Sequence, residues 1–433
     1  MFADSVSAQS WVSCITPTSV HINSLTTWSG KLIIGGFSSQ GKYILSYDGL
    51  VFDTIGIIDD THPSVWALQE YNNELYVGGD FESINGIIVN GIAKYDGAAW
   101  QSLGTGLGGN FGNFQTEAFA VLNNELFVGG LFDSINGIPA KNIARWNGTS
   151  WNSMGVGFNG GVSALGVYQN ELYAGGYFFL SGADTVNHVA KWDGIHWQSL
   201  LHGIEPGITS WGNTVFAIKE FQNTLYVGGL FAVADTIQSY NIACWNGSNW
   251  TAGPANLYGT VTDLSIYNNK LFIGGFFEYS PGNISYATSW DGISLDNLQG
   301  GLLGTSGLKE VWDIEVYNNR IYYGGNIYSD ATMNVVSEGL IAWDEFNSSV
   351  NDLDDIEKLK VFPVPVTDKL HFLLDIPSQV IRYSIADRLG RIVLCDEATN
   401  QGIIDVTSLD DGFYVLTLIN YSGSKSAHFI KNQ

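Results

Sequence analysis

A Gly-Gly pair that closes a short apolar run recurs seven times in this chain of 433 residues. Around each pair the pattern is fuller: residues 71–79 read Tyr-Asn-Asn-Glu-Leu-Tyr-Val-Gly-Gly, and residues 267–275 read Tyr-Asn-Asn-Lys-Leu-Phe-Ile-Gly-Gly. Self-similarity at a roughly constant spacing is typical of repeat architectures, in which each repeat is one supersecondary unit. The pairs are Gly35-Gly36, Gly78-Gly79, Gly129-Gly130, Gly175-Gly176, Gly228-Gly229, Gly274-Gly275 and Gly324-Gly325.

Each unit predicts four β-strands. The alternating segment 65–71 suits a first strand, and 74–81 a second. Between them, Asn72-Asn73 predicts a two-residue hairpin turn, because Asn tolerates the positive φ that such turns require. Asn147-Gly148 and Asp193-Gly194 predict the same two-residue turn between strands three and four. A unit of about 40–50 residues with four strands and no helical periodicity is typical of a propeller blade. We therefore expect an all-β chain with a seven-bladed β-propeller over residues 1–346.

The two ends of the repeat region predict how the ring closes. The seventh unit, Trp343 to Ser348, carries no bulky residue where its fourth strand should be, whereas Trp11 precedes the first Gly-Gly pair by the same 24 residues as Trp151 and Trp250 precede theirs. We expect the segment near Trp11 to supply the fourth strand of blade seven, which removes exposed sheet edges. The other units place a bulky residue there, namely Phe52, Trp100, Trp151, Trp197, Trp250 and Leu295.

The repeat ends after Trp343, and a second domain is expected. Residues 347–358 are polar and acidic, which is typical of a linker. Beyond them, alternating segments near 369–376, 380–387, 391–396 and 412–419 predict a small Ig-like antiparallel β-sandwich over 359–433.

Four short motifs in this tail carry a family resemblance. The segments 361–370, 385–391, 404–414 and 428–431 resemble, in order, the conserved motifs of type A C-terminal sorting domains of the bacterial type IX secretion system. One departure is Val364, where the family usually has Asn. The residues that carry the resemblance are Pro363, Pro365, Asp387, Gly390, Arg391, Gly412, Tyr414 and Lys431.

The resemblance implies export from a Bacteroidota-type bacterium. The partner it implies is the type IX secretion machinery, and the location is extracellular or the outer-membrane surface. Such tails are commonly removed, and the cargo is released or tethered to lipopolysaccharide. Proteins of this class carry a cleaved signal peptide; because the segment 1–5 has neither a basic nor an apolar region, we expect that peptide to be absent from this sequence. The repeats themselves resemble those of kelch-like secreted bacterial propellers and of fungal cortical polarity-marker proteins, a similarity that says little about ligand.

Composition excludes several classes of partner. The formal net charge is −24, which repels phosphate backbones and anionic lipid headgroups, so we expect no nucleic-acid partner. No apolar run reaches about 18 residues, so we expect no membrane span. Cys14, Cys244 and Cys395 lie far apart in the chain and predict neither a disulfide framework nor a zinc cluster.

No residue pattern predicts a catalytic site or a metal site. Asp193 resembles the Asp of a sialidase Asp-box, but turn chemistry explains it better, and the Gly-Gly pairs are better explained by close packing near an axis than by phosphate binding. His188 and His202 share a unit and could meet, with Glu205 nearby, although a chance pair of histidines explains them as well. The segment 80–86 has oxygen ligands without the spacing of a calcium loop, which leaves weak calcium binding as the only cofactor alternative.

Loop length indicates which face of the ring carries a binding site. In a four-stranded blade, the 1–2 and 3–4 turns lie on one face of the ring, and here they are short. The 2–3 and blade-to-blade loops lie on the other face, and segments such as 104–116 and 200–214 are long. The candidate ligand-binding aromatics of this loop face are Phe111, Phe114, Phe158, Trp211 and Tyr258, whose rings suit sugars or protein contacts unless they tuck back onto the ring.

These features favour a secreted or cell-surface, non-catalytic binding protein for adhesion or for glycan or protein recognition. One alternative is a polysaccharide-active hydrolase or lyase, which would need two acidic side chains within about 5–10 Å on the loop face. Another alternative is a structural spacer with a flat loop face.

Overall fold

The computed structural model describes residues 10–14, 20–38, 41–59, 64–109, 114–205, 213–254, 257–280, 283–284, 286–304, 310–330, 335, 337, 339–345, 360–373, 381–387, 392–398, 402–420 and 423–432. The chain divides into two compact units, one of which spans Gln9–Glu345 and the other of which contains Phe346–Gln433. Among the described residues the structure is almost entirely β; the one helical turn there is η2 (Leu298–Gly300). The expected all-β class is confirmed.

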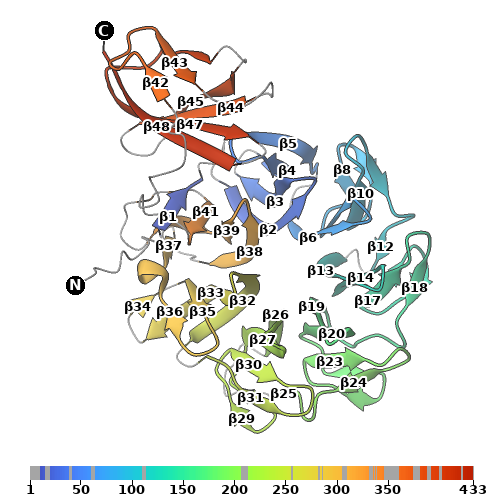
Figure 1. Cartoon of the computed structure of the whole chain (residues 1–433). Helices are drawn as coiled ribbons and strands as arrows, with labels where there is room; N and C mark the ends of the chain where they lie inside the picture. Colours follow the sequence, from blue (N-terminus) through green and yellow to red (C-terminus); the bar gives the residue numbers. More distant parts are fainter. Residues whose placement is uncertain are drawn as a thin grey trace. The chain divides into compact units, whose positions relative to one another are not determined.

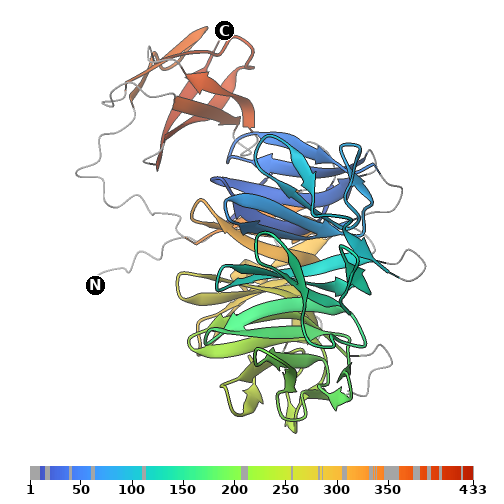
Figure 2. The same cartoon turned by 90° about the vertical axis from the view of Figure 1, so that its right-hand side faces the viewer.

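The first unit is a ring of antiparallel sheets (Figure 1). Within the described residues it contains six four-stranded sheets and one five-stranded sheet, in which a short extra strand pairs with the second strand; we number these sheets as blades 1 to 7 in chain order. Each inner strand lies beside the inner strand of the next blade, and the series closes between blades 7 and 1. Figure 2 shows the same sheets from the side. The inner strands are β2 (Val20–Trp28), β6 (Val65–Tyr71), β13 (Gln115–Leu122), β19 (Val162–Tyr168), β26 (Thr214–Phe221), β32 (Tyr258–Tyr267) and β38 (Val311–Tyr317).

Three further strands complete each blade outward from the axis. The second strands are β3 (Lys31–Ser38), β7 (Glu74–Gly79), β14 (Glu125–Leu131), β20 (Glu171–Gly176), β27 (Thr224–Leu230), β33 (Lys270–Ser280) and β39 (Arg320–Gly325). The third are β4 (Gly41–Tyr47), β10 (Ile92–Tyr95), β17 (Ile143–Trp146), β23 (Val189–Trp192), β30 (Ile242–Trp245), β35 (Ala287–Trp290) and β41 (Leu340–Asp344). The outer strands are β5 (Phe52–Ile57), β11 (Trp100–Ser102), β18 (Trp151–Ser153), β24 (Trp197–Ser199), β31 (Trp250–Ala252), β36 (Leu295–Asp296) and β1 (Ser10–Ser13).

The outer strand of blade 7 comes from the start of the chain. Strand β1 pairs antiparallel with β41, and Trp11 lies opposite Trp343. The Trp11 indole Nε1 donates to the Leu298 carbonyl in blade 6, as the Trp151 and Trp250 indoles donate to carbonyls of the blades before theirs. Trp11 therefore occupies the position that a tryptophan of the outer strand holds in other blades.

The Gly-Gly pairs are sites of close packing between and within blades. A Cβ on Gly35 would lie 2.4 Å from Cγ1 of Val65 in the next blade, and the fit recurs around the ring until Ile22 packs on Gly324. The second glycine faces its own inner strand: a Cβ on Gly79 would lie 2.0 Å from the Ser64 carbonyl oxygen. A side chain at either glycine would push the neighbouring strands apart, which explains why a Gly-Gly pair recurs in every blade.

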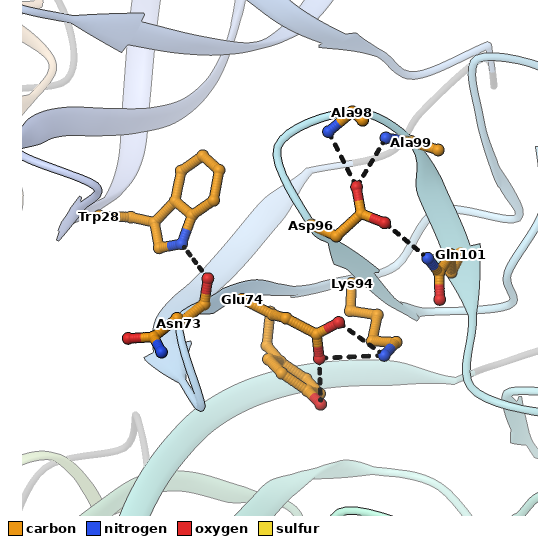
Figure 3. A network of polar contacts seen from close by, with 9 residues as sticks. Trp28, Asn73, Glu74, Lys94, Asp96, Ala98, Ala99 and Gln101 are labelled. Atoms are coloured by element: carbon orange, nitrogen blue, oxygen red, sulfur yellow. Dashed lines mark hydrogen bonds and ion pairs between the residues drawn. The ribbon is translucent and has the colours of Figure 1, made fainter.

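The two kinds of short turn differ. The 1–2 turns have two residues with positive φ, such as Asn72 (53°) and Asn73 (63°), as expected. The expected two-residue turn between strands three and four is wrong, because the loop has four residues. In blade 2, Asp96 Oδ1 accepts the amides of Ala98 and Ala99, and Gly97 adopts φ 98° (Figure 3). The side chain replaces a backbone partner and so favours the longer Asx turn.

Small β-hairpins occupy the long 2–3 connections, which sequence alone left as loops. Several of them pair with the segment that leaves the preceding blade, so the loop face carries its own layer of short strands. The hairpin strands are β8 (Ser83–Ile84), β9 (Ile87–Ile88), β15 (Ser134–Ile135), β16 (Ile138–Pro139), β21 (Leu180–Ser181), β22 (Asp184–Thr185), β28 (Val233–Ala234) and β29 (Ile237–Gln238). The 2–3 connections of blades 6 and 7 contain β34 (Asn283–Ile284) and β40 (Ile327–Asp330). The segments that leave a preceding blade contain β12 (Leu107–Gly108), β25 (Ile204–Glu205) and β37 (Leu302–Gly304).

The C-terminal unit consists of two antiparallel sheets that share one core. The first sheet contributes Leu370, Phe372 and Ile404 to that core, and the second contributes Ile385, Leu416 and Phe429 among others. The first sheet contains β42 (Lys360–Phe362), β43 (Lys369–Leu373) and β46 (Ile403–Asp405), and the second contains β44 (Ile381–Asp387), β45 (Ile392–Ala398), β47 (Gly412–Asn420) and β48 (Gly423–Lys431).

Candidate binding site at the propeller axis

A β-bulge interrupts every inner strand at the same place. In each blade the pairing between the first and second strands skips one residue, for example Trp66 between Val65 and Ala67. The skipped residue always lies 12 positions before the first glycine of its Gly-Gly pair. Bulges redirect side chains and are frequent next to functional sites. The seven bulge residues are Asn23, Trp66, Glu117, Ser163, Phe216, Thr262 and Trp312.

Two of these residues serve the joints between blades. Ser163 Oγ donates to the Val215 carbonyl at 3.0 Å, and Thr262 Oγ1 donates to the Val311 carbonyl. In both cases the acceptor belongs to the inner strand of the next blade. Hydroxyl side chains at the bulge therefore join adjacent inner strands.

Two indoles meet across blade 1. The ring centroids of Trp66 in blade 2 and Trp312 in blade 7 are 6.2 Å apart, with their planes at 72°. Asn23, the bulge residue of the blade between them, is 8% exposed. Neither the Asn23 Nδ2 nor the Trp66 Nε1 has a hydrogen-bond partner in the described structure, although both atoms are buried. Two bulge residues of adjacent blades thus each carry a buried donor without an acceptor, which is energetically costly.

A carboxylate lies on the neighbouring blade. Glu117 accepts hydrogen bonds from the Gln115 amide and, at 3.5 Å, from the Tyr177 hydroxyl of blade 4. Burial raises the pKa of Glu117 to about 7, although these two donors act in the opposite direction. Gly161 makes room for the tyrosine, since a Cβ there would lie 2.1 Å from the Tyr177 hydroxyl oxygen.

A second acidic group lies between blades 6, 7 and 1. Asp263 Oδ2 accepts the Ile314 amide at 2.8 Å, and Asp313 Oδ2 accepts the Leu25 amide at 2.7 Å. The two aspartates are also hydrogen-bonded to each other. Burial raises the pKa of both, and the neighbouring Asp263 raises that of Asp313 further.

Two charged side chains adjoin this aspartate pair. Burial raises the pKa of Glu315 to about 7, and Lys219 lowers the pKa of both Glu315 and Asp263. The aspartate oxygens accept hydrogen bonds that join neighbouring blades. The equivalent positions in blades 2 to 5 are alanines, so the charged joints are a feature of blades 6 and 7.

Exposed aromatic rings lie farther out on the loop face. Tyr258 is 43% exposed and lies 6.0 Å from Tyr240, centroid to centroid; Tyr240 is itself 45% exposed. Phe276, 49% exposed, pairs with Thr260, two residues before the bulge residue Thr262. We call Tyr177, Tyr240, Tyr258 and Phe276 the aromatic collar.

The five aromatics predicted from sequence are placed differently from one another. Tyr258 is exposed and belongs to the collar. The prediction that Phe158 is exposed is wrong: it is 1% exposed and stacks on Phe178. The neighbouring backbone is held to the β21–β22 hairpin, since the Asn159 amide donates to the Leu180 carbonyl. Phe114 packs partly buried against the core of blades 2 and 3. Phe111 and Trp211 lie outside the described residues.

The candidate histidines do not meet as a pair. His188 is buried and its Nδ1 contacts the Gly176 carbonyl at 3.2 Å, whereas His202 pairs with Asp235. Burial lowers the pKa of His188, and the bond to Asp235 raises that of His202. The two residues therefore have separate structural partners.

The segment 80–86 forms part of the β8–β9 hairpin. Its Asn85 Oδ1 accepts the Ile57 amide, and its Gly86 amide is accepted by Asp59. Across the described residues, no group of three or more His, Cys, Asp or Glu side chains is arranged to hold a metal ion.

The polar residues of the opposite, short-turn face serve the blades themselves. Trp28 Nε1 donates to the Asn73 carbonyl of the next blade at 3.0 Å, and Lys94 bonds Glu74 across strands at 2.8 Å (Figure 3). The Asx turn of Asp96 lies beside them. Because these polar groups are already paired within or between blades, we place the candidate site at the axis and on the loop face.

In the C-terminal unit the predicted motifs lie close together. The bridge Val366–Lys431 joins the segment of Pro363 and Pro365 to the last strand, and Gly412 pairs with Lys431. Asp387 pairs with Tyr414, whose hydroxyl donates to the Asp410 carbonyl at 2.9 Å. Gly390 and Arg391 lie outside the described residues.

Comparison with protein families decides what this unit is. Residues 360–432 match the model of the secretion system C-terminal sorting domain. The C-terminal unit is a sorting domain of type IX secretion. The resemblance expected from the four motifs is confirmed, and it implies a protein that is secreted or held at the cell surface. In the described residues, no helix is both long and apolar enough to cross a bilayer.

Across the whole chain, the similarities to known proteins are weak. No curated protein matches it. Among solved structures, it is similar to the WD40 β-propeller domain of Doa1, with 11% identity, a TM-score of 0.45, and coverage of 77% of this chain and 97% of that chain. It is also similar to the β-propeller domain of the Trilobed protease from Pyrococcus furiosus, with 9% identity, a TM-score of 0.45, and coverage of 77% and 100%.

The residues at the axis were missed by sequence reasoning. Trp66, Trp312 and Glu117 lie near the starts of inner strands, where they read as ordinary alternating positions. The constant spacing of 12 residues before Gly-Gly could have aligned all seven bulge residues and shown that three of them are large aromatics.

Proposed function

We propose that the protein is a non-catalytic binding protein, exported by the type IX system, that recognises a glycan or a surface protein with the loop face of its propeller. The observation that carries this proposal is the aromatic collar. Tyr177, Tyr240, Tyr258 and Phe276 are 36–49% exposed and lie in the connections or strand ends of the loop face. Exposed aromatic rings on a rigid scaffold are typical of recognition surfaces.

The test is direct binding by the full chain. An array of glycans and bacterial surface proteins is probed with the wild type and with Tyr258→Ala. The matched control is Phe413→Ala, which removes an aromatic ring that is 68% exposed in the sorting domain. We expect Tyr258→Ala to weaken binding at least fivefold and Phe413→Ala to leave it unchanged. If the wild type binds neither a glycan nor a surface protein, the proposal is contradicted.

A polysaccharide-active hydrolase or lyase is the second candidate, and the aspartate pair is the observation that favours it. Asp263 and Asp313 are a pair of buried acids, but their mutual hydrogen bond brings them closer than the about 5–10 Å that such enzymes leave between two carboxyl groups. Each also accepts a backbone amide of the next blade, which is a structural use. Release of reducing ends from neutral and uronic-acid polysaccharides, lost in Asp313→Asn, would establish the enzyme. A structural spacer would show neither binding nor cleavage.

A further inference from the structure

We propose that the axial site formed by Asn23, Trp66, Trp312 and Glu117 binds one neutral sugar unit at the end of a glycan. This inference rests on the proposed function and names its ligand class. The axial site would then bind the terminal sugar unit, and the aromatic collar would contact the rest of the glycan.

The unpaired donors are the first argument. Asn23 Nδ2 and Trp66 Nε1 are buried without a partner in the described structure. A buried donor in this state favours any ligand that brings an oxygen to it. Sugar hydroxyl oxygens are acceptors of suitable size, and each hydroxyl can also donate to a carboxylate such as Glu117.

The indoles are the second argument. Trp66 and Trp312 meet edge to face, so part of each ring face is left without an aromatic partner. Trp66 and Trp312 are each partly exposed. The apolar C–H face of a sugar ring packs on an indole face, while its hydroxyls reach the polar groups around it.

Charge is the third argument. The seven described inner strands carry Glu70, Glu117, Glu220, Asp263, Asp313 and Glu315, whereas Lys219 is their one lysine or arginine. Lys219 already interacts with Asp263 and Glu315. An axis of this sign disfavours sialic acids, uronic acids and sulfated sugars, so the site selects a neutral glycan end.

The experiment uses the full chain and an array of neutral and anionic glycans, followed by titration with the best neutral oligosaccharide. Trp66→Phe keeps an aromatic ring and removes the Nε1 donor, so we expect binding about 3- to 10-fold weaker, the effect of one neutral hydrogen bond. Trp312→Leu, at a partly exposed position, should weaken binding more than tenfold. Trp197→Phe is the matched control, because its Nε1 is likewise buried without a partner but lies in the outer strand of blade 4.

A second readout does not depend on affinity. In the ¹⁵N-labelled wild type, the Trp66 indole N–H resonance should move downfield on addition of the oligosaccharide, and the Trp197 resonance should stay in place. This readout also serves if Trp66→Phe fails to fold.

The outcomes separate this inference from the proposed function. Glycan binding that Tyr258→Ala weakens but that Trp66→Phe and Trp312→Leu do not would overturn the axial site and retain the collar. Binding of anionic glycans alone, or of a protein alone, would also overturn it. If the wild type binds nothing on either array, the proposed function fails as well.

Discussion

The indole Nε1 of Trp11 donates a 2.9 Å hydrogen bond to the carbonyl of Leu298, 287 residues further along the chain. The same indole lies 4.8 Å from the ring of Trp343 and 5.3 Å from that of Tyr323. One side chain thus links the first described strand to blades 6 and 7.

Replacement of Trp11 by alanine should open the ring at blade 7. Deleting a buried tryptophan typically costs about 3–5 kcal/mol, so we expect the free energy of unfolding in urea to fall by that amount. Trp11→Phe, which loses mainly the Nε1 donor, should cost roughly 1 kcal/mol. If the chain without residues 1–15 melts at the wild-type temperature, β1 does not close the ring.

Alanine at a first glycine of the repeat should be strongly destabilising, and a partner mutation should relieve it. In Gly175→Ala the new Cβ would lie 2.3 Å from Cγ1 of Val215. We expect a loss of roughly 1–3 kcal/mol from this overpacking. Adding Val215→Ala removes the clashing methyl groups, so thermal melts should show the double variant to be more stable than Gly175→Ala alone; equal stability would contradict the packing account.

The acidic residues of the axis predict that stability falls as pH rises. Asp263, Asp313, Glu117 and Glu315 all have raised pKa values in the folded protein, those of the two glutamates being about 7. Between the unfolded values near 4 and these raised values, the folded state holds more protons than the unfolded state. The free energy of unfolding therefore decreases through this window, to about pH 7 for the glutamates, and is lowest above it.

Asp313→Asn tests the aspartate contribution. The amide oxygen can still accept the Leu25 amide, while the buried negative charge is lost. We expect a higher melting temperature than wild type at pH 8 and a smaller difference at pH 4. The control is Asp193→Asn, an exposed Asx-turn position where blade 3 already has Asn147; it should not raise the melting temperature at pH 8.

The sorting domain should direct export of an unrelated cargo. A reporter fused to residues 347–433 should leave the periplasm of a type IX-competent bacterium, whereas a fusion that ends at residue 402 should not, because it lacks β46, β47 and β48. Fractionation of cells and medium measures the result. Retention of both fusions would contradict the assignment of an export signal to this unit.

The repeat itself made much of the fold predictable. The Asn-Asn turns, the Gly-Gly pairs and the Trp11 spacing are local signals whose physical cause lies within a few residues or recurs in every unit. The hairpins of the loop face were not predictable, because strands of two residues carry no periodicity. Phe158 was misjudged for a related reason: whether a loop aromatic is buried depends on the chain that returns over it, here Phe178 of the same blade.

The candidate site was the least predictable part. Trp66 and Trp312 are 246 positions apart in sequence and adjoin only because the ring brings blades 2 and 7 to either side of blade 1. The aspartate joints were hidden for the same reason, since each acid is satisfied by an amide of another blade.

The fit of a branched side chain on the glycine of the preceding blade is the same at every joint, from Val65 on Gly35 to Ile22 on Gly324. This packing contact by itself therefore favours no joint over another as the place where the chain begins. A circularly permuted chain has its original ends joined and new termini placed between two other blades. Such a chain should fold to the same ring, provided that the strand of Trp11 still pairs with β41.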